Sequence, residues 1–241
     1  MSPLWGRGWL SVLIFATLMG SVGVAHSAAT QAETCRAATT LSTNLGLMRG
    51  HLLVAAELFE AGHIELAQRH SKHPAEEVYQ ELLPGLAQFE VPGFAAELGA
   101  FADALAAGEQ GRELFSNRYA QLMQTMSAIE DRLPLGVRQQ QHIAFALVSQ
   151  AAVEYAVGVA EDGRVKDIQE YQDAYGFVTV AKGKVVDEAA AGTGQLARAF
   201  SAALRLWPKL MPQRPVATES DDLAELVALM RQQGMAAPAC D

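Results

Sequence analysis

Histidine is concentrated in one short stretch of this sequence, Gly50–Tyr79, which reads GHLLVAAELFEAGHIELAQRHSKHPAEEVY. The stretch contains four of the six histidines of the chain. Neutral imidazole nitrogen binds zinc, copper and iron, and a nearby carboxylate adds neutralising charge. The candidate metal ligands in this stretch are His51, His70, His73 and Glu77.

The spacing of apolar residues predicts two antiparallel helices that position these side chains. His51, Val54 and Leu58 recur at helical spacing and share one face. Gly62 is expected to end the first helix, because glycine adopts the left-handed conformation at least cost. With a rise of 1.5 Å per residue, His51 lies roughly 15 Å before this joint, and His70 and His73 lie about 12 to 16 Å after it. The three imidazoles are therefore expected at similar depth.

A third helix is expected to begin at Pro74, where the missing N–H costs nothing. Glu77 then falls in the positive first turn of that helix and lies towards His70 and His73. The stretch has no HExxH motif or comparably strict zinc spacing. The alternative that the histidines only make structural hydrogen bonds therefore stays open.

A second group of polar residues follows about 80 residues later in the chain. The segment 143–159 is apolar nearly all round, as in a helix at the centre of a bundle, but it contains Gln150 and Glu154. A buried carboxylate must be paired, protonated or bound to a ligand, unless Glu154 lies at the solvent edge. Glu170 and Asp173 share a face of the next helix. Such acidic faces are usually solvated, but if the bundle brings them together, Glu154, Glu170 and Asp173 complete a metal site.

The sequence predicts an all-α fold, a mainly antiparallel helical bundle in one domain, 28–241, with a Pro-rich linker at 208–220. Ala, Leu, Gln and Glu are abundant, and runs of β-branched residues are almost absent. The segment AAELFEAGHIELAQRH is similar to a tetratricopeptide helix pair, without a second copy at that period. Proline and glycine breaks, Pro84-Gly85 among them, separate the remaining predicted helices: 74–83, 92–107, 110–132, 137–159, 165–181, 187–206 and 221–233.

Residues 1–27 have the pattern of a secretory signal peptide. Arg7 precedes an apolar run, 9–24, and small residues predict cleavage after Ser27 or Ala29. An uncleaved membrane anchor is the alternative, although the run is short for a span. The predicted location is the periplasm, with no membrane span after cleavage.

The chain has two cysteines, Cys35 and Cys240, one near each end of the predicted mature protein. In an oxidising compartment such a pair is expected to form a disulfide, while two free thiols are the alternative. The bridge would bring the final helix, 221–233, beside the first mature helix.

Charge and motifs argue against several functions. The net charge of −9 disfavours nucleic acid and anionic membranes as partners. There is no GxSxG motif, Walker loop or dinucleotide fingerprint, so we expect no enzyme activity.

Residues 154–177 resemble a known family. Glu154-Tyr155, Asp162-Gly163-Arg164-Val165, Glu170-Tyr171-Gln172-Asp173 and Phe177 are similar to the extracytoplasmic helical segment of bacterial iron permeases of the high-affinity Ftr type. The permease's membrane helices with their REXXE motif are absent, so the resemblance implies binding or delivery of iron, not transport. The first half is similar to uncharacterised secreted helical proteins of proteobacteria.

The first functional hypothesis is therefore a periplasmic protein that binds or delivers a metal ion. The resemblance favours iron, whereas the histidines favour copper or zinc. An inner-membrane metal transporter or another periplasmic protein would be its partner. Two alternatives stay open: a carrier of a lipid, hopanoid or sterol between the helices, and a non-catalytic adaptor that uses the tetratricopeptide-like pair.

Overall fold

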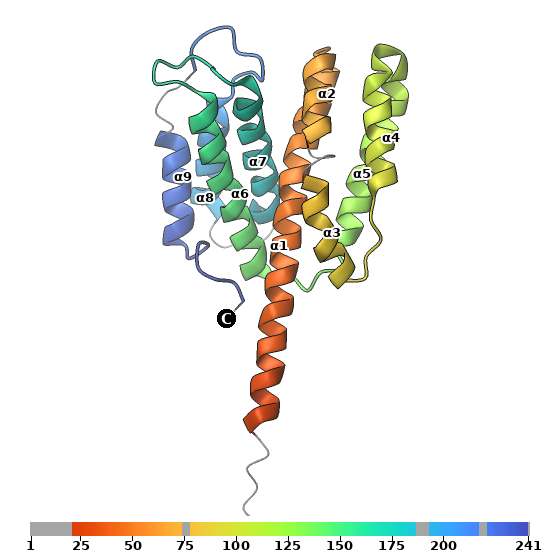
Figure 1. Cartoon of the computed structure of the whole chain (residues 1–241). Helices are drawn as coiled ribbons and strands as arrows, with labels where there is room; N and C mark the ends of the chain where they lie inside the picture. Colours follow the sequence, from red (N-terminus) through yellow and green to blue (C-terminus); the bar gives the residue numbers. More distant parts are fainter. Residues whose placement is uncertain (1–20, 74–77, 187–192, 217–220, 241) are drawn as a thin grey trace, which may run out of the picture.

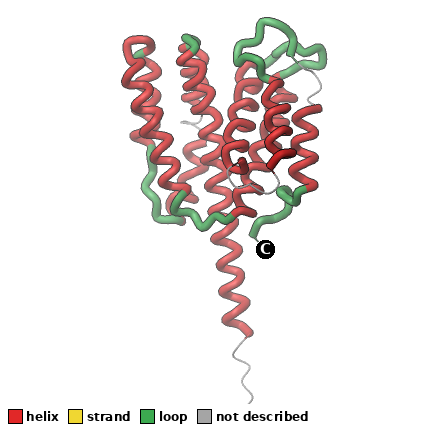
Figure 2. Tube along the Cα trace, turned by 180° about the vertical axis from the view of Figure 1, so that it is seen from behind, coloured by secondary structure: helices red, strands yellow, loops and turns green. Residues whose placement is uncertain are grey.

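The computed structural model describes residues 21–73, 78–186, 193–216 and 221–240. These residues form helices joined by loops, and the predicted all-α fold is confirmed (Figure 2). The α-helices are α1 (Ser21–Glu60), α2 (Ile64–His73), α3 (Tyr79–Gln88), α4 (Ala95–Ala106), α5 (Arg112–Glu130), α6 (Val137–Gly158), α7 (Ile168–Val186), α8 (Thr193–Ala203) and α9 (Asp221–Gln232).

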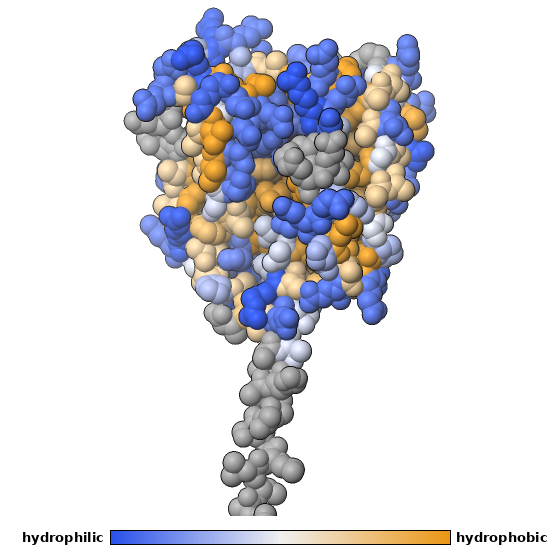
Figure 3. Space-filling view, viewed as in Figure 1, coloured by the Kyte–Doolittle hydropathy of each residue, from blue (hydrophilic) through white to orange (hydrophobic). Residues whose placement is uncertain are grey.

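Helix α1 runs through the centre of the molecule. Helices α2 to α5 lie on one side of it and α6 to α9 on the other, while its N-terminal turns project beyond both groups (Figure 1). The two groups have separate hydrophobic cores, and the partly buried Leu135 and Tyr175 pack against both. Hydrophilic side chains cover the end of the molecule opposite the projecting turns (Figure 3). Because α1 also packs against α6 and α7, it joins the two groups.

The sequence of α1 explains its central position. Its buried residues recur alternately three and four positions apart, which is the pattern of a continuous apolar stripe: Ala38, Leu41, Leu45, Met48, Leu52, Ala55 and Phe59. Val54 and Leu58, outside this stripe, are also fully buried. A helix that is covered on two faces can connect two cores.

The predicted joint after α1 is confirmed. Gly62 has φ +81°, and the N–H of His63 donates to the carbonyl of Leu58 at 2.8 Å, so the helix ends in a left-handed turn. Helix α2 then runs back along α1, as the sequence predicts.

The break predicted at Pro84-Gly85 is wrong, because α3 continues through both residues. Pro84 removes one backbone donor, but the helix keeps Tyr79, Leu82 and Leu86 buried against its neighbours. A Cβ at Gly85 would lie 3.1 Å from the side chain of Leu41, so glycine here allows α3 to approach α1 closely.

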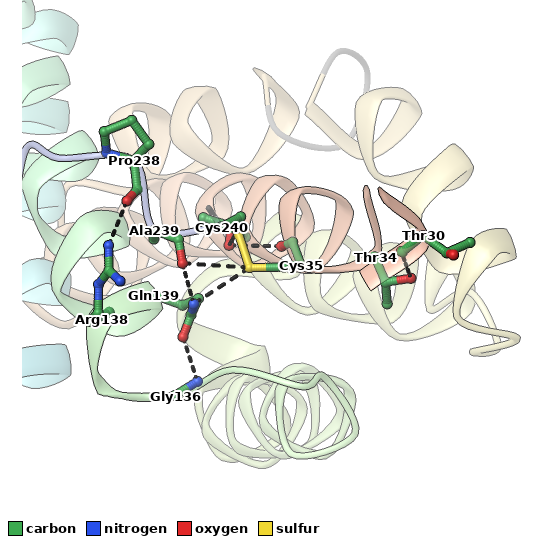
Figure 4. The surroundings of a disulfide bond; sticks show 10 residues. Thr30, Thr34, Cys35, Gly136, Arg138, Gln139, Pro238, Ala239 and Cys240 are labelled. Atoms are coloured by element: carbon green, nitrogen blue, oxygen red, sulfur yellow. Dashed lines mark hydrogen bonds between the residues drawn. A yellow bond between two sulfur atoms is a disulfide. The ribbon is translucent and has the colours of Figure 1, made fainter. Parts of the chain in front are cut away.

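The cysteines form the expected disulfide, and the Cα atoms of Cys35 and Cys240 are 5.6 Å apart. At the start of α6, Arg138 donates to the carbonyl of Pro238 and Gln139 to that of Ala239, so α6 also holds the C-terminal segment (Figure 4). The expectation that the final helix docks beside α1 is wrong. Helix α9 packs against α8 and α6, and the residues that follow it reach α1.

The backbones of α1 and α7 meet at two glycines. A Cβ at Gly176 would clash with the backbone carbonyl of Gly50, and a Cβ at Gly50 would clash with the ring of Phe177. This close approach holds the middle of α1, including His51, directly against α7.

Replacing Gly176 with alanine tests this contact. The added methyl group must push α1 and α7 apart, so Gly176→Ala is expected to lower the free energy of unfolding by about 1–3 kcal/mol in urea denaturation. Gly183→Ala on the same helix is the matched control, because a Cβ there meets nothing within 4 Å. That change is expected to raise stability by about 0.5–1 kcal/mol through helix propensity. Equal effects of the two changes would contradict the role of the glycine contact.

Removing the disulfide tests how the ends are held. The bridge joins residues 205 positions apart, and the chain-entropy model assigns such a loop on the order of 5 kcal/mol. Cys240→Ser is therefore expected to lower the thermal unfolding midpoint, and a reductant should lower the wild-type midpoint to the same value. A reductant that further lowers the midpoint of Cys240→Ser would show that the effect has another source.

Candidate metal centre

Three helices bring two histidines and one aspartate together in the interior. The Nδ1 atoms of His51 on α1 and His70 on α2 lie 2.6 and 2.9 Å from the same oxygen, Oδ1 of Asp173 on α7. All three residues are buried. Their potential ligand atoms lie within 4.8 Å of one another, and together they form the group that we call the inner triad.

The antiparallel pairing of α1 and α2 places the two imidazoles. His51 and His70 reach the same carboxylate from opposite sides of the Gly62 joint, which confirms that they lie at similar depth. Asp173 is not solvated as residues on an acidic helix face usually are, because only 3% of its surface is exposed. The packing of α1 on α7 covers that part of the helix.

A glutamine orients the second imidazole of the triad. Oε1 of Gln172 lies 2.7 Å from Nε2 of His70, while Nε2 of Gln172 donates to the carbonyl of Leu210 at 2.9 Å. Because the glutamine amide donates to that carbonyl, its oxygen faces His70, and His70 must carry a proton on Nε2. The nitrogen left for a proton or a metal ion is Nδ1, which faces Asp173.

Nothing in the residue pattern identifies Gln172 as a site residue, although it adjoins Asp173 in the EYQD segment. Successive residues of a helix point about 100° apart. Gln172 and Asp173 therefore contact different nitrogens of the His70 ring, Nε2 and Nδ1 respectively. The segment predicted as a Pro-rich linker takes part as well, through Leu210. It is held on α7 by Trp207, whose Nε1–H donates to the carbonyl of Tyr171 at 2.6 Å.

The charge of the triad follows from these contacts. Burial by itself raises the pKa of the Asp173 carboxyl. Hydrogen bonds from His51 and His70, and the positive charge of their rings, outweigh burial and lower this pKa to about 2. Asp173 is therefore ionised at neutral pH and attracts protons or a cation to the two Nδ1 atoms.

A cleft of about 330 Å³ opens beside the triad. Helices α1, α6 and α7 and the start of α3 supply its lining: Leu47, His51, Val78, Glu81, Gln150, Glu154, Gln169, Glu170, Asp173 and Phe177. The cleft thus contains Glu154 and Glu170 together with two members of the triad. His73 and Glu77, the other predicted ligands, cannot be placed, because the side chain of His73 and all of Glu77 lie outside the described residues.

Glu154 and Glu170 are half-buried and interact directly. Nε2 of Gln150 donates to Oε1 of Glu154 at 2.5 Å. A hydrogen bond with Glu154, burial, and repulsion by Glu154 and Asp173 together raise the pKa of Glu170 to about 8. At neutral pH the carboxyl group of Glu170 is therefore mostly protonated.

The raised pKa of Glu170 predicts a pH dependence of stability. The pKa of Glu170 rises from 4.5 to about 8 on folding, so its contribution is fully present below about pH 4.5 and is lost as the pH rises to about 8. Glu170→Gln keeps a neutral side chain and is expected to show a shallower fall in the free energy of unfolding across this range, measured by urea denaturation without added metal. The exposed Glu161 provides the control Glu161→Gln. If Glu170→Gln has the same slope as the control, the pKa of Glu170 is not raised in the folded protein.

A protein-family model matches the second group of helices, α6 to α9. Residues 137–237 match the family model of the iron permease-associated 4-helix bundle domain. The match runs from the first residue of α6 past the end of α9 and includes Glu154, Glu170, Gln172 and Asp173. No curated protein and no solved structure matches the chain. The part of the chain that supplies the carboxylates is thus similar to a bundle domain associated with iron permeases, as the resemblance of residues 154–177 indicates.

Proposed function

We propose that this protein binds a metal ion at His51, His70 and Asp173 in the periplasm and delivers it. The observation that carries the proposal is the convergence of two imidazole nitrogens on one buried, ionised carboxylate oxygen. The hydrogen bond of Gln172 to the far nitrogen of His70 is the kind of contact that orients metal-binding histidines.

The distances in the triad fit a shared ion closely. Ligand atoms bonded to one metal at about 2.0–2.2 Å, with bond angles of about 90–109°, lie about 2.8–3.6 Å apart. The separation of His70 Nδ1 from Asp173 Oδ1, 2.9 Å, already falls in this range. The separation of His51 Nδ1 from the same oxygen, 2.6 Å, has to increase by about 0.2 Å. Without a metal, protons on the Nδ1 atoms account for the same contacts.

The donor set favours an exchangeable ion of the first transition row. Two histidines and one carboxylate suit Fe²⁺, and also Zn²⁺, and leave coordination positions open. His51 and Asp173 border the cleft, which gives an ion a route to the triad. The match of residues 137–237 supports iron as the ion, while the imidazoles accept zinc and copper too.

Several features support a periplasmic location and a membrane transporter as partner. The disulfide between Cys35 and Cys240 suits an oxidising compartment. Among the described residues, the helices lack a segment long and apolar enough to cross a membrane. The matched domain is associated with iron permeases, so a permease is a suitable acceptor for the ion. The signal peptide remains a prediction, since residues 1–20 lie outside the described residues.

The alternative functional hypotheses have less structural support. The lipid-carrier and adaptor alternatives depend on composition and on the pairing of α1 with α2, and no contact described above favours either. The absence of enzyme activity stays a prediction from the sequence.

Metal titration of a His70 variant tests the proposal. Protein made without a histidine tag is titrated calorimetrically with Zn²⁺, and with Fe²⁺ under anaerobic conditions. Wild type is expected to bind one equivalent at the triad, and His70→Ala to bind it on the order of 100-fold more weakly. Gln172→Leu removes the hydrogen bonds of Gln172 to His70 and Leu210 and keeps His51, His70 and Asp173. This variant is expected to bind the ion about 10–100-fold more weakly than wild type.

The matched control is His63→Ala, because His63 is an exposed histidine that adjoins the same helix. This variant is expected to bind like wild type. Equal binding by His63→Ala and His70→Ala would overturn the proposal, as would a wild-type protein that binds neither ion.

A further inference from the structure

The loop of residues 206–211, which we call the clamp loop, holds the side chain of Gln172 in one orientation. Nε2 of Gln172 donates to the carbonyl of Leu210 at 2.9 Å and to Sδ of Met211 at 3.4 Å, so both hydrogens of the amide nitrogen have acceptors in the loop. The side chain is fully buried, and solvent does not compete for these contacts. The amide oxygen therefore stays directed at Nε2 of His70, 2.7 Å away.

Two aromatic residues fix the clamp loop on α7. The hydroxyl of Tyr171 donates to the carbonyl of Lys209 at 3.2 Å, and the carbonyl of Leu206 lies 3.4 Å from the same hydroxyl. In the opposite direction, Nε1–H of Trp207 donates to the carbonyl of Tyr171 at 2.6 Å. Tyr171 and Trp207 are both buried. A shift of the loop would break these hydrogen bonds and would also remove the two acceptors of Gln172.

The proton of His70 is subject to two opposing preferences. Asp173 faces Nδ1 of the ring at 2.9 Å, and a carboxylate in this position favours a neutral imidazole with its proton on Nδ1. That proton would occupy the nitrogen that the inner triad offers to a metal ion. The oxygen of Gln172 instead requires the proton on Nε2, which leaves Nδ1 available.

We propose that the clamp loop, held by Tyr171 and Trp207, keeps the proton of His70 on Nε2 and so makes Nδ1 the metal-binding nitrogen. Tyr171 is thus a positioning residue that acts through Gln172 and not on the ion itself. The inference rests on the proposed function, because it names what prepares the same site for metal. The place of the proton can also be measured without metal, so the two can fail separately.

Zinc titration of Tyr171→Phe tests this role. The variant keeps the buried ring and removes the hydroxyl that holds the loop. Full-length oxidised protein without a histidine tag is expected to bind Zn²⁺ about threefold to tenfold more weakly after this change, a smaller loss than that of a direct partner of the imidazole. In the Gln172→Leu background the same change is expected to have no further effect, because the contact through which it acts is already absent.

Tyr79→Phe is the matched control. Tyr79 is a buried tyrosine whose hydroxyl also bonds the backbone of a loop, by accepting from the N–H groups of Phe94 and Ala95 at 3.0 and 3.1 Å. The control is expected to lose stability, because two backbone donors lose their acceptor, and to bind zinc like wild type.

Three results of the zinc titrations would overturn the inference. The first is unchanged zinc binding by Tyr171→Phe. The second is an equal loss of zinc affinity in Tyr79→Phe, which would show that lower stability alone explains the effect. The third is a loss that Tyr171→Phe causes to the same extent in the Gln172→Leu background, because the effect would then not pass through Gln172.

Nitrogen NMR of isotopically labelled, metal-free protein locates the proton directly. At neutral pH, wild type is expected to show an N–H signal from Nε2 of His70 that exchanges slowly with water and is absent from His70→Ala. Tyr171→Phe is expected to exchange this proton about tenfold faster, since the loop that holds Gln172 opens more readily. A wild-type protein without a slowly exchanging proton on Nε2 would contradict the inference.

The two kinds of measurement separate this inference from the proposed function. If wild type binds no metal, but Tyr171→Phe speeds the exchange of the Nε2 proton, the metal function is wrong and the positioning by the clamp loop stands. If wild type binds zinc at the inner triad without a slowly exchanging proton on Nε2, the proposed function stands and the positioning is wrong.

Discussion

The close contact between α1 and α7 is the constraint on which the rest of the structure depends. At Gly50 and Gly176 the two backbones meet without side chains between them. One residue along α1, His51 reaches the carboxylate of Asp173, and its ring packs edge-on against Phe177. A larger residue at Gly50 or Gly176 would push α1 away from α7. The Nδ1 atom of His51 would then move away from the carboxylate of Asp173. The helix that joins the two hydrophobic cores is thus also the helix that assembles the candidate metal centre.

Buried charge reinforces the same contact farther along the helices. Glu130 of α5 receives hydrogen bonds from Ser42 of α1 at 2.7 Å and from Lys184 of α7 at 2.8 Å, and Arg49 of α1 lies 3.3 Å away. Burial raises the pKa of Glu130, but the two cations and these hydrogen bonds lower it more. Removing one partner from such a network leaves a poorly solvated charge, which costs much more than an exposed ion pair. The network around Glu130 therefore holds α1, α5 and α7 together on one side of the Gly50 contact.

The candidate centre combines two kinds of ligand in one place. The first group of helices contributes imidazole through α1 and α2, and the matched bundle domain contributes carboxylates through α6 and α7. Neither group holds the inner triad alone, because Asp173 comes from one and His70 from the other. The helices that precede the matched residues therefore supply both histidines of the candidate centre.

The sequence by itself determined the features that depend on local pattern. Apolar spacing and turn residues predicted the helices, the joint at Gly62 and the common depth of His51 and His70, since period and handedness are local properties. The position of the two cysteines predicted their bridge.

Only the tertiary structure decided which helix face meets which partner. The acidic face of α7 has the sequence of a solvated face, yet α1 covers Asp173, and the loop at Leu210 orients Gln172. Helix α3 likewise continues through Pro84, where local propensity predicts a break. In each case contacts between segments distant in sequence outweigh a local preference, because burying a helix face and pairing a buried charge stabilise by more than one backbone hydrogen bond.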